Sequence, residues 1–531
     1  MYDTKMSRLK HFYQRVHYIP LFILLLTIGM NMCFTSCKHL GASLLDTETS
    51  AFKEYKDSID TLLMHKCLTA TMQGDTTHWR ADLAVKHRYD SLAATGDWAV
   101  WFDEEGVSED ADALLEYLRT ELPANGLDAR PFLTSQIEED LDIIHKLAFD
   151  SVKQSINEVL PRLDYNLSKA YVRYVAGMRY GFVRPDKLLN KLYIRQDRGY
   201  YAHLFDYEIK APAYGEVIQK MTEEDRIDYL TSSQPTSYIY KDLQEHLKKC
   251  TDKDERRKTA VNMERCRWNI KHPEKGQRMV LVNLPSQQLW GIGGKEPLSM
   301  KICCGAWDTK TPLLCSQIGY IQVNPEWSIP PKIVESDFSR HVGDSAWFAR
   351  HQYFVVNRKT GDTLNIASIG ASGMKNQGLR FVQRGGAGNS LGRIVFRFLN
   401  NFSIYLHDTN QKYVFDRDRR TVSHGCVRVE KPFELASFML PDVDDWTLDR
   451  LRISMDIPPV TERGMKWLKD HAGRPRPYKL LAYHAITPKM PIYIVYYTVF
   501  PNPETGVIET WPDFYGYDKP IKEAMNSLLP E

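Results

Sequence analysis

The spacing of apolar residues along the chain changes its period near residue 275. Before that point, apolar positions recur every three to four residues, the spacing of amphipathic helices, and predict helices at 110–122, 134–155, 167–180 and 240–268. The first of these ends at Pro123-Ala-Asn-Gly126, where asparagine and glycine suit a helix C-cap. Residues 38–270 are therefore predicted to form a helical domain.

From Arg278 onward, short runs of apolar and β-branched residues predict β-strands instead of helices. A long insertion at about 328–390, rich in glycine near its end, interrupts the strands. A segment of that length inside a compact domain is usually functional, as a lid or binding element, or else disordered. The expected strands are 279–285, 288–292, 318–324, 393–398 and 403–407.

The end of the chain returns to mixed structure. Helices are expected near 432–439 and 459–471, followed by a β-hairpin that begins at 493–500 and turns at 502–506. The predicted fold class is therefore α+β. A helical N-terminal domain precedes a mainly β domain at 275–455, and a C-terminal helix and hairpin at 456–531 pack on the β domain.

The N-terminus has the pattern of an export signal. Basic residues precede an apolar run at Tyr18–Met30, which is shorter than the ~20 residues of a membrane-spanning helix but suits a secretory signal. It is followed by Phe34-Thr-Ser-Cys37, which resembles the lipobox of bacterial lipoproteins, with Phe34 where leucine is usual. Residues 1–37 are thus expected to be a lipoprotein-type signal peptide, with Cys37 lipidated and the mature protein membrane-anchored on the periplasmic face of the cell envelope. The alternatives are a plain signal peptide or a signal anchor, with Cys37 incidental.

Composition narrows the possible functions. A chain of 531 residues predicts roughly two or three domains. A formal net charge of +2 gives no electrostatic basis for binding nucleic acid. The nine cysteines show no CxxC pair and no Cys/His spacing typical of structural zinc, so neither a disulfide framework, a metal site nor a cofactor is expected. Four cysteines are expected to be small buried apolar residues: Cys266, Cys303, Cys304 and Cys315.

Cys426 differs from the other cysteines because of its neighbours. It lies in Ser423-His-Gly-Cys-Val-Arg428, between strand-like and helix-like sequence where a turn can expose a side chain. A nucleophilic thiolate needs a basic partner, and His407, at the end of a predicted strand, could supply it. Gly425 permits a strained turn in which its own N–H and that of Cys426 face a developing oxyanion. His424 is adjacent in sequence but need not face the thiol, and a buried cysteine with satisfied histidines remains the alternative.

These residues resemble a known family. Ser-His-Gly-Cys-Val-Arg at 423–428, with His407 upstream, is similar to the signature of the L,D-transpeptidases of the YkuD type. The resemblance extends in order over nearly all of the mature chain and is to the large YcbB-like branch with a helical scaffold domain. The segments that carry it are Gly126-Leu-Asp, Leu163-Asp-Tyr, Arg179-Tyr-Gly-Phe-Val-Arg-Pro185, Met279-Val-Leu-Val-Asn-Leu-Pro285, Thr311-Pro, Val323-Asn-Pro-Glu-Trp-Ser-Ile-Pro-Pro331, Gly388-Asn-Ser-Leu-Gly-Arg393, Tyr405-Leu-His-Asp-Thr409, Ile494-Val-Tyr-Tyr-Thr498 and Asp513-Phe-Tyr-Gly516.

The resemblance implies an activity and roles for these residues. Cys426 would attack a peptidoglycan stem peptide and release terminal D-Ala, and a second stem peptide would resolve the thioester as a 3→3 cross-link. His407 would activate the thiol, with its ring oriented by the backbone carbonyl of Asp408, and His424 would support catalysis or pack. Residues 328–390 would form a capping subdomain, and carbapenems would acylate the thiol. The residues expected to bind substrate are Arg428, Tyr405, Ser423 and Asp408, of which Arg428 and Tyr405 could instead be structural.

The sequence departs from this family branch in one respect, and several other functions have to be weighed against the implied one. The peptidoglycan-binding helical module often found in this branch is not identifiable, so glycan affinity would come from the scaffold or the cap. The same acyl-enzyme could serve an L,D-carboxypeptidase or attach an envelope protein to peptidoglycan, because the acceptor is chosen elsewhere. A non-catalytic lipoprotein that tethers the wall is disfavoured by the intact Cys, His and Gly. A papain-like protease is disfavoured because Cys426 follows its histidine in the chain.

Overall fold

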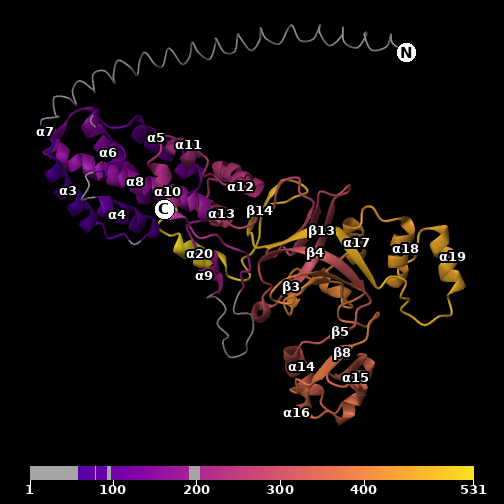
Figure 1. Cartoon of the computed structure of the whole chain (residues 1–531). Helices are drawn as coiled ribbons and strands as arrows, with labels where there is room; N and C mark the ends of the chain where they lie inside the picture. The colour runs from indigo at the N-terminus through magenta and orange to yellow at the C-terminus, as the bar shows by residue number, and fades with distance from the viewer. Residues whose placement is uncertain (1–57, 78, 93–96, 104, 191–203) are drawn as a thin grey trace, which may run out of the picture. The chain divides into compact units, whose positions relative to one another are not determined.

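The computed structural model describes residues 58–531, apart from 78, 93–96, 104 and 191–203 (Figure 1). The predicted signal peptide and Cys37 lie outside the described residues. The chain divides into two compact units, and the first consists of residues up to 121 together with 129–175 and 213–232. No helix in the described part of the chain is both long enough and apolar enough to cross a membrane.

The first unit is helical, as predicted. Its longest helix, α8 (Ile156–Tyr180), is buried on nearly every side, which explains why its tyrosines are fully covered. The buried carboxylate of Asp164 on α8 accepts hydrogen bonds from the Tyr89 hydroxyl and the backbone N–H groups of Val100 and Trp101. The other helices of this unit are α3 (Thr61–Gly74), α4 (Arg80–Leu92), most of α5 (Glu109–Ala124), α6 (Thr134–His145), α7 (Phe149–Val152), α10 (Tyr214–Met221) and α11 (Arg226–Thr231).

Two predicted helices are each divided in the structure. The helix expected at 134–155 stops at His145, and Leu147 at φ 51° and Lys153 at φ 56° adopt the left-handed conformation that ends a helical run. The helix expected at 240–268 is divided into α12 (Tyr238–Lys249) and α13 (Lys253–Arg267). The second break is set by Asp252, whose side chain accepts a hydrogen bond from the Glu255 N–H and so caps α13. Both α12 and α13 belong to the second unit.

The second unit is organised around a nine-stranded sheet with the order β11-β3-β12-β10-β9-β4-β13-β1-β2. Strand β2 also pairs with β3, so the sheet closes into a barrel. The strands are β1 (Met279–Asn283), β2 (Gln288–Ile292), β3 (Leu298–Gly305), β4 (Leu314–Val323), β9 (Ile394–Phe398), β10 (Leu406–His407), β11 (Thr421–Ser423), β12 (Val427–Val429) and β13 (Tyr483–Val495). Outside the insertion, the helices of this unit are α9 (Pro185–Leu189), α12, α13, α17 (Pro432–Met439), α18 (Asp445–Ser454), α19 (Glu462–Asp470) and α20 (Asp518–Ala524). The predicted α+β class is confirmed.

The C-terminal segment is more deeply integrated than its sequence indicates. Strand β13 is one of the strands that form the barrel wall, where it pairs antiparallel with β4 and parallel with β1. It therefore does not pack on the outside of a finished domain. The hairpin expected from 493 is displaced, because Tyr493–Val495 belong to β13 and the hairpin consists of β14 (Val499–Pro501) and β15 (Ile508–Thr510). Pairing on both edges of β13 buries Ile492, Tyr493 and Ile494 completely, which favours this arrangement.

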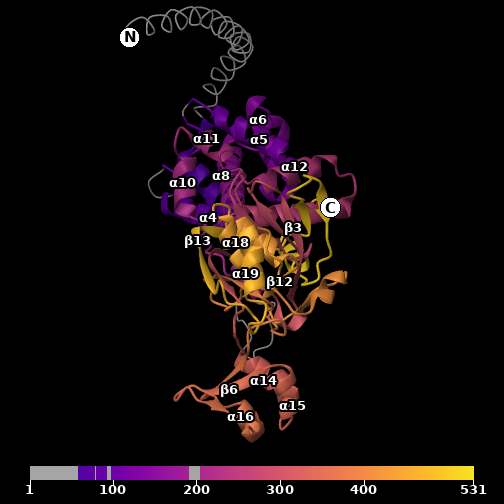
Figure 2. The same ribbon diagram turned by 90° about the vertical axis from the view of Figure 1, so that its right-hand side faces the viewer.

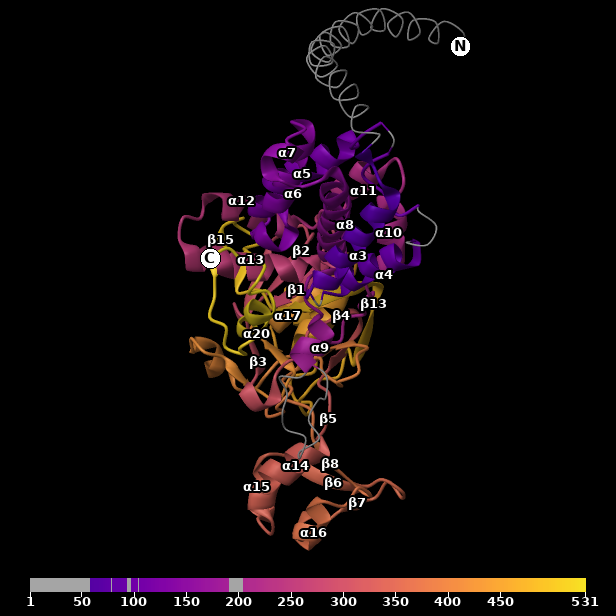
Figure 3. The ribbon, with the colours of Figure 1, turned by 90° about the vertical axis from the view of Figure 1, so that its left-hand side faces the viewer.

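The predicted insertion has a small fold of its own. It contains a four-stranded sheet in the order β5-β8-β6-β7, and Figures 2 and 3 show its strands and helices grouped together. Its separate apolar core includes Phe338, Phe348, Val355 and Phe381. Its elements are β5 (Trp327–Ser328), α14 (Pro331–Asp337), α15 (Ser345–Arg350), β6 (Tyr353–Asn357), β7 (Thr363–Leu364), α16 (Ala371–Met374) and β8 (Leu379–Gln383). The expected capping role stays a prediction.

Candidate active site

The barrel brings His407 and the Cys426 turn together through one pair of parallel strands. Leu406 and His407 of β10 lie opposite Val427 and Arg428 of β12. The Val427 N–H donates to the Tyr405 carbonyl at 3.1 Å, so Cys426 enters β12 beside Tyr405. Strand pairing therefore fixes the neighbourhood of residues that are nineteen positions apart in the chain. The strand expected at 403–407 is shortened to Leu406–His407, because Ser403 has φ 55°, a left-handed conformation that does not belong to a strand.

The turn before Cys426 is held by the hydroxyl of Ser423 and by two threonine hydroxyls from the segment after β3. Gly425 has φ 110°, a conformation that favours glycine and makes a side chain costly there. The Ser423 hydroxyl donates to the Cys426 carbonyl at 2.5 Å, and the Thr311 hydroxyl donates to the Gly425 carbonyl at 2.9 Å. Thr309 donates to the Ser423 carbonyl at 2.8 Å. The turn is therefore fixed before any substrate binds.

Two sequence-based assignments in this turn need correction. The Gly425 N–H was expected to face an oxyanion, but it donates to the Ser423 hydroxyl at 3.1 Å. The Cys426 N–H is the remaining one of the two expected oxyanion donors. Ser423 was expected to contact substrate, but its side chain is buried and engaged in the turn. A hydroxyl two residues before a glycine at positive φ closes such a turn locally, which explains both differences.

The thiol of Cys426 is half-buried and protonated at neutral pH. Burial raises its pKa to about 11, and hydrogen bonds from Tyr405 together with the charges of Arg397 and Arg428 only partly oppose this. The apolar expectation for three other cysteines, Cys266, Cys303 and Cys304, is confirmed by their burial, whereas Cys315 is half-buried. Cys426 is therefore a neutral thiol that requires a base to react.

His407 is buried and neutral. Burial lowers its pKa to about 3, the charges of Arg428 and Arg397 lower it further, and the carbonyls of Asp408 and Leu391 oppose the shift. Its Nδ1 hydrogen-bonds to the Asp408 backbone carbonyl. That contact assigns the proton to Nδ1 and leaves Nε2 as the basic nitrogen. The ring orientation by Asp408, expected from the resemblance, matches this hydrogen bond.

Tyr405 lies against both the thiol and the imidazole. Its ring is 5.7 Å from that of His407, edge to face, and its hydroxyl hydrogen-bonds to Cys426. The guanidinium of Arg397 lies over the Tyr405 ring, 4.3 Å from its centre. Sequence reasoning missed Arg397, although a lone arginine in the apolar strand Ile394–Phe398 was a visible signal. The contact of Thr311 with the Cys426 turn was also not predicted, because Thr311 drew attention only within the Thr311-Pro segment of the resemblance.

Arg428 and His424 differ in their surroundings. Arg428 donates to the Gln411 side chain at 3.0 Å, while its Nε is buried without a hydrogen-bond partner among the described residues. The His424 side chain is 46% exposed, and its Nε2 lies 4.0 Å from Asp337 of α14. Trp327 of β5 hydrogen-bonds to Tyr405. The insertion thus contributes Asp337 and Trp327 to the surroundings of the site.

Asp408 was expected to bind substrate, but its side chain serves the adjoining loop. The carboxylate is buried and accepts hydrogen bonds from the Arg393 N–H at 2.8 Å, the Thr409 N–H at 2.7 Å and Lys412 Nζ at 2.6 Å. Gly392, at φ 62°, lies so close that a Cβ there would meet the carboxylate. These three donors occupy the carboxylate in the folded loop, which favours a structural role for Asp408 over contact with substrate.

Replacing Asp408 with alanine should destabilise the catalytic unit by about 3 kcal/mol, because two buried N–H groups lose their acceptor. Chemical denaturation of wild type and variant measures this change. Lys412→Gln is the matched control, since its side chain is 53% exposed and its ion pair should contribute no more than about 1 kcal/mol. Equal destabilisation by both substitutions would contradict the loop role of Asp408.

Known proteins match this arrangement. Residues 277–453 match the family YkuD, described as the L,D-transpeptidase catalytic domain, and residues 93–247 match the family described as the Scaffold domain. A protein of Haemophilus influenzae named "Putative L,D-transpeptidase" is 26% identical over 369 residues, which cover 67% of this chain and 70% of that protein.

The barrel, with His407 on β10 and Cys426 directly before the paired strand β12, is thus an L,D-transpeptidase catalytic domain of the YkuD type. Because a Scaffold domain precedes it, the chain has the YcbB-type architecture, as the resemblance implied. The matched Scaffold region ends at residue 247, within α12, so it includes elements of both compact units.

Proposed function

We propose that the protein cross-links peptidoglycan through a Cys426 thioester. Cys426 Sγ would attack the carbonyl that joins the third stem residue, a diamino acid, to terminal D-Ala. The thiol proton would pass to His407 Nε2 and then to the departing amine of D-Ala. The side-chain amine of a second stem peptide would then attack the thioester, lose a proton and release the thiol, giving a 3→3 cross-link. The carrying observation is that β10 and β12 place His407 and Cys426 around Tyr405 in a domain of this family.

Charge at the site supports acyl transfer. Arg397 and Arg428 both favour the thiolate, so they would also favour negative charge that develops during attack. Arg428 favours the thiolate through its charge, and Tyr405 contacts both Cys426 and the His407 ring. Arg428 and Tyr405 therefore remain the best candidates for shaping the donor site.

Acylation should be nearly independent of pH between about pH 5 and 9. A neutral thiol next to a neutral imidazole reacts by general-base catalysis, and neither group changes charge in that range, since their pKa values are about 11 and about 3. Protonation of His407 would remove the base only at strongly acidic pH. Stopped-flow acylation by a carbapenem, with the folded state checked at each pH, measures this profile. A loss of rate on acidification through pH 6 would instead indicate a thiolate–imidazolium pair.

Product analysis tests the proposed reaction. The purified protein is incubated with a disaccharide-tetrapeptide, and the products are separated by mass. Cross-linked dimer together with free D-Ala is the expected result. Tripeptide and D-Ala without dimer would favour the L,D-carboxypeptidase alternative, and adding an envelope protein with a free amine would test attachment to peptidoglycan. Absence of any acyl-enzyme or product would favour the tethering alternative.

We further propose that Cys37 carries a lipid that anchors the protein at the periplasmic side of a membrane. The apolar run and the lipobox-like Phe34-Thr-Ser-Cys37 support this proposal. Cells that express the protein are grown with a labelled fatty acid, and the label should enter wild type but not Cys37→Ala. Labelling of the variant, or a soluble wild-type protein, would contradict it.

A further inference from the structure

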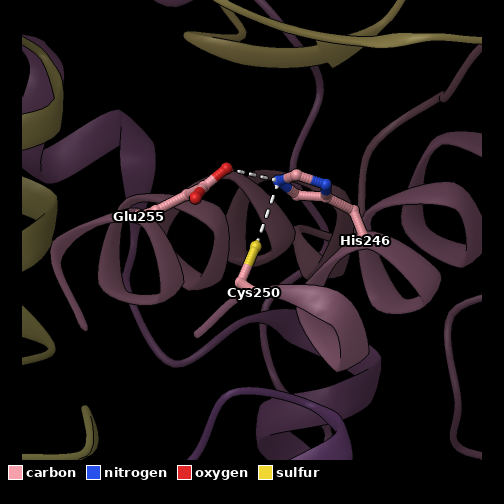
Figure 4. A group of neighbouring side chains, drawn as sticks. All are labelled: His246, Cys250 and Glu255. Atoms are coloured by element: carbon pink, nitrogen blue, oxygen red, sulfur yellow. Dashed lines mark hydrogen bonds and ion pairs between the residues drawn. The ribbon is translucent and has the colours of Figure 1, made fainter. Parts of the chain in front are cut away.

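A second group of reactive side chains lies at the junction of α12 and α13, in the second unit. Figure 4 shows His246, Cys250 and Glu255 directed toward one another. His246 Nε2 is 3.2 Å from Cys250 Sγ and 3.1 Å from the nearer Glu255 carboxylate oxygen. We propose that these three side chains bind one Zn²⁺ ion, which clamps the turn between the two helices.

The local fold explains why the three side chains converge. His246 and Cys250 are four residues apart and therefore lie on the same face at the end of α12. The intervening turn is short, because Asp252 caps α13 and places Glu255 in its first turn. The geometry is thus set by a helix end and a cap, independently of the three ligands.

The three side chains are also joined by hydrogen bonds, because the Cys250 thiol contacts Glu255 as well as His246. One imidazole nitrogen, Nε2, faces both the sulfur and the carboxylate oxygen (Figure 4). A single N–H can be directed well at only one of these acceptors. All three candidate ligand atoms lie within 4.8 Å of one another. A cation between them would satisfy the lone pairs of all three at once.

The spacing fits zinc closely. Ideal tetrahedral coordination, with Zn–N and Zn–O near 2.0 Å and Zn–S near 2.3 Å, places nitrogen and sulfur about 3.6 Å apart and nitrogen and oxygen about 3.3 Å apart. The two distances in the structure, 3.2 and 3.1 Å, would need to increase by only a few tenths of an ångström. A mixed N, S and O donor set suits Zn²⁺ better than Ca²⁺ or Mg²⁺, which prefer oxygen.

The burial and the charge of the three side chains also suit the binding of Zn²⁺. Cys250 is 8% exposed, whereas the side chains of His246 and Glu255 are 20% and 43% exposed, so an ion can enter and a water molecule can be its fourth ligand. Zn²⁺ with one thiolate and one carboxylate is electrically neutral, and binding would release the thiol proton to solvent. The nearby Arg256 guanidinium donates to the carbonyls of Leu247 and Cys250 at the end of α12, where its charge favours the helix terminus.

This site departs from the expectation that the chain binds no metal. That expectation rested on the absence of CxxC pairs and of the usual Cys/His spacing. The spacing His-x3-Cys-x4-Glu is not that of a common metal-binding motif. In addition, the expected continuous helix over 240–268 would not have placed Glu255 next to Cys250. The helix break at Cys250–Asp252 creates the cluster.

Cobalt binding tests the proposal on the metal-free, full-length protein. Co²⁺ should give a thiolate charge-transfer band with one ion per chain. Cys250→Ser should remove this band, whereas Cys426→Ala, which removes the thiol of the active site, should retain it. Competition with a chromophoric chelator should show Zn²⁺ affinity falling at least about 100-fold in Cys250→Ser, because a charged ligand is lost.

Thermal unfolding gives a second readout. Saturating Zn²⁺ should raise the Tm of wild type by about 5 °C and that of Cys250→Ser by much less, because the ion binds only the folded junction. Glu255→Gln is a second variant that does not depend on the folding of Cys250→Ser, because it keeps the size of a partly exposed side chain. It should weaken Zn²⁺ binding by removing the carboxylate charge. A wild-type protein without the band and without the Tm increase would overturn the proposal. So would a band that persists in Cys250→Ser, since the thiolate ligand would then lie elsewhere.

Discussion

Cys426→Ala should abolish acyl transfer, with a loss of at least about 10⁴-fold, while the protein remains folded. The thiol is the only group in the proposed mechanism that bonds to the substrate carbonyl, so no neighbouring side chain can replace it. The side chain is small and half-buried, and its removal leaves the hydroxyl contacts of the turn unchanged. Intact-protein mass after incubation with a carbapenem measures the covalent adduct, and circular dichroism with thermal unfolding checks the fold.

Cys315→Ala is the matched control for this experiment. Cys315 is also a half-buried free thiol, but it lies on β4 opposite Tyr493 of β13, outside the site. The control should therefore acylate at the wild-type rate. Turnover that survives in Cys426→Ala would contradict the mechanism, and adduct formation on Cys315 would show that mass alone does not identify the nucleophile.

His407→Ala should reduce the acylation rate by about 10³-fold, whereas His424→Ala should reduce it by less than about tenfold. His407 is buried and oriented through Nδ1 toward the Asp408 carbonyl, and a general base of this kind typically contributes 10²- to 10⁴-fold. The His424 side chain is 46% exposed, and its Nε2 lies 4.0 Å from Asp337 of the insertion. Its loss should therefore affect catalysis much less than the loss of His407. Single-turnover acylation rates compare the two variants directly.

A volume-conserving variant separates chemistry from packing at His407. His407→Gln keeps much of the buried volume, so a rate loss with an unchanged Tm would show that the imidazole acts as the base. Equal losses in the His407 and His424 variants, or a larger loss at His424, would show that the base has been assigned to the wrong histidine.

The sequence predicted those features that depend on local spacing. The change of apolar period near residue 275 separates the helical region from the barrel, and glycine at 425 indicated the turn that the structure shows at φ 110°. The segment Ser423–Arg428 and His407, which the sequence singled out together, lie on and beside the paired strands β10 and β12, and their catalytic roles stay a prediction. Each of these signals lies within a few residues of the feature that it predicts.

Features that depend on distant partners could not be predicted in this way. The position of β13 inside the barrel depends on pairing with β1, about two hundred residues earlier, and nothing near Tyr483 indicates that partner. Asp408 and Ser423 were expected to bind substrate from the family resemblance, which does not specify their local contacts. Their actual partners, the Arg393 N–H and the carbonyl of Cys426, are set by the folded loops.

The position of β13 between β4 and β1 also limits when the barrel can close as the chain is synthesised. During synthesis, β4 and β1 emerge from the ribosome long before Tyr483–Val495, the strand that separates them in the sheet. Until that strand arrives, both edges carry unpaired backbone groups that invite aggregation or recognition by chaperones. A nascent chain that stops after residue 455 would contain Cys426 and His407 but could not close the barrel around them.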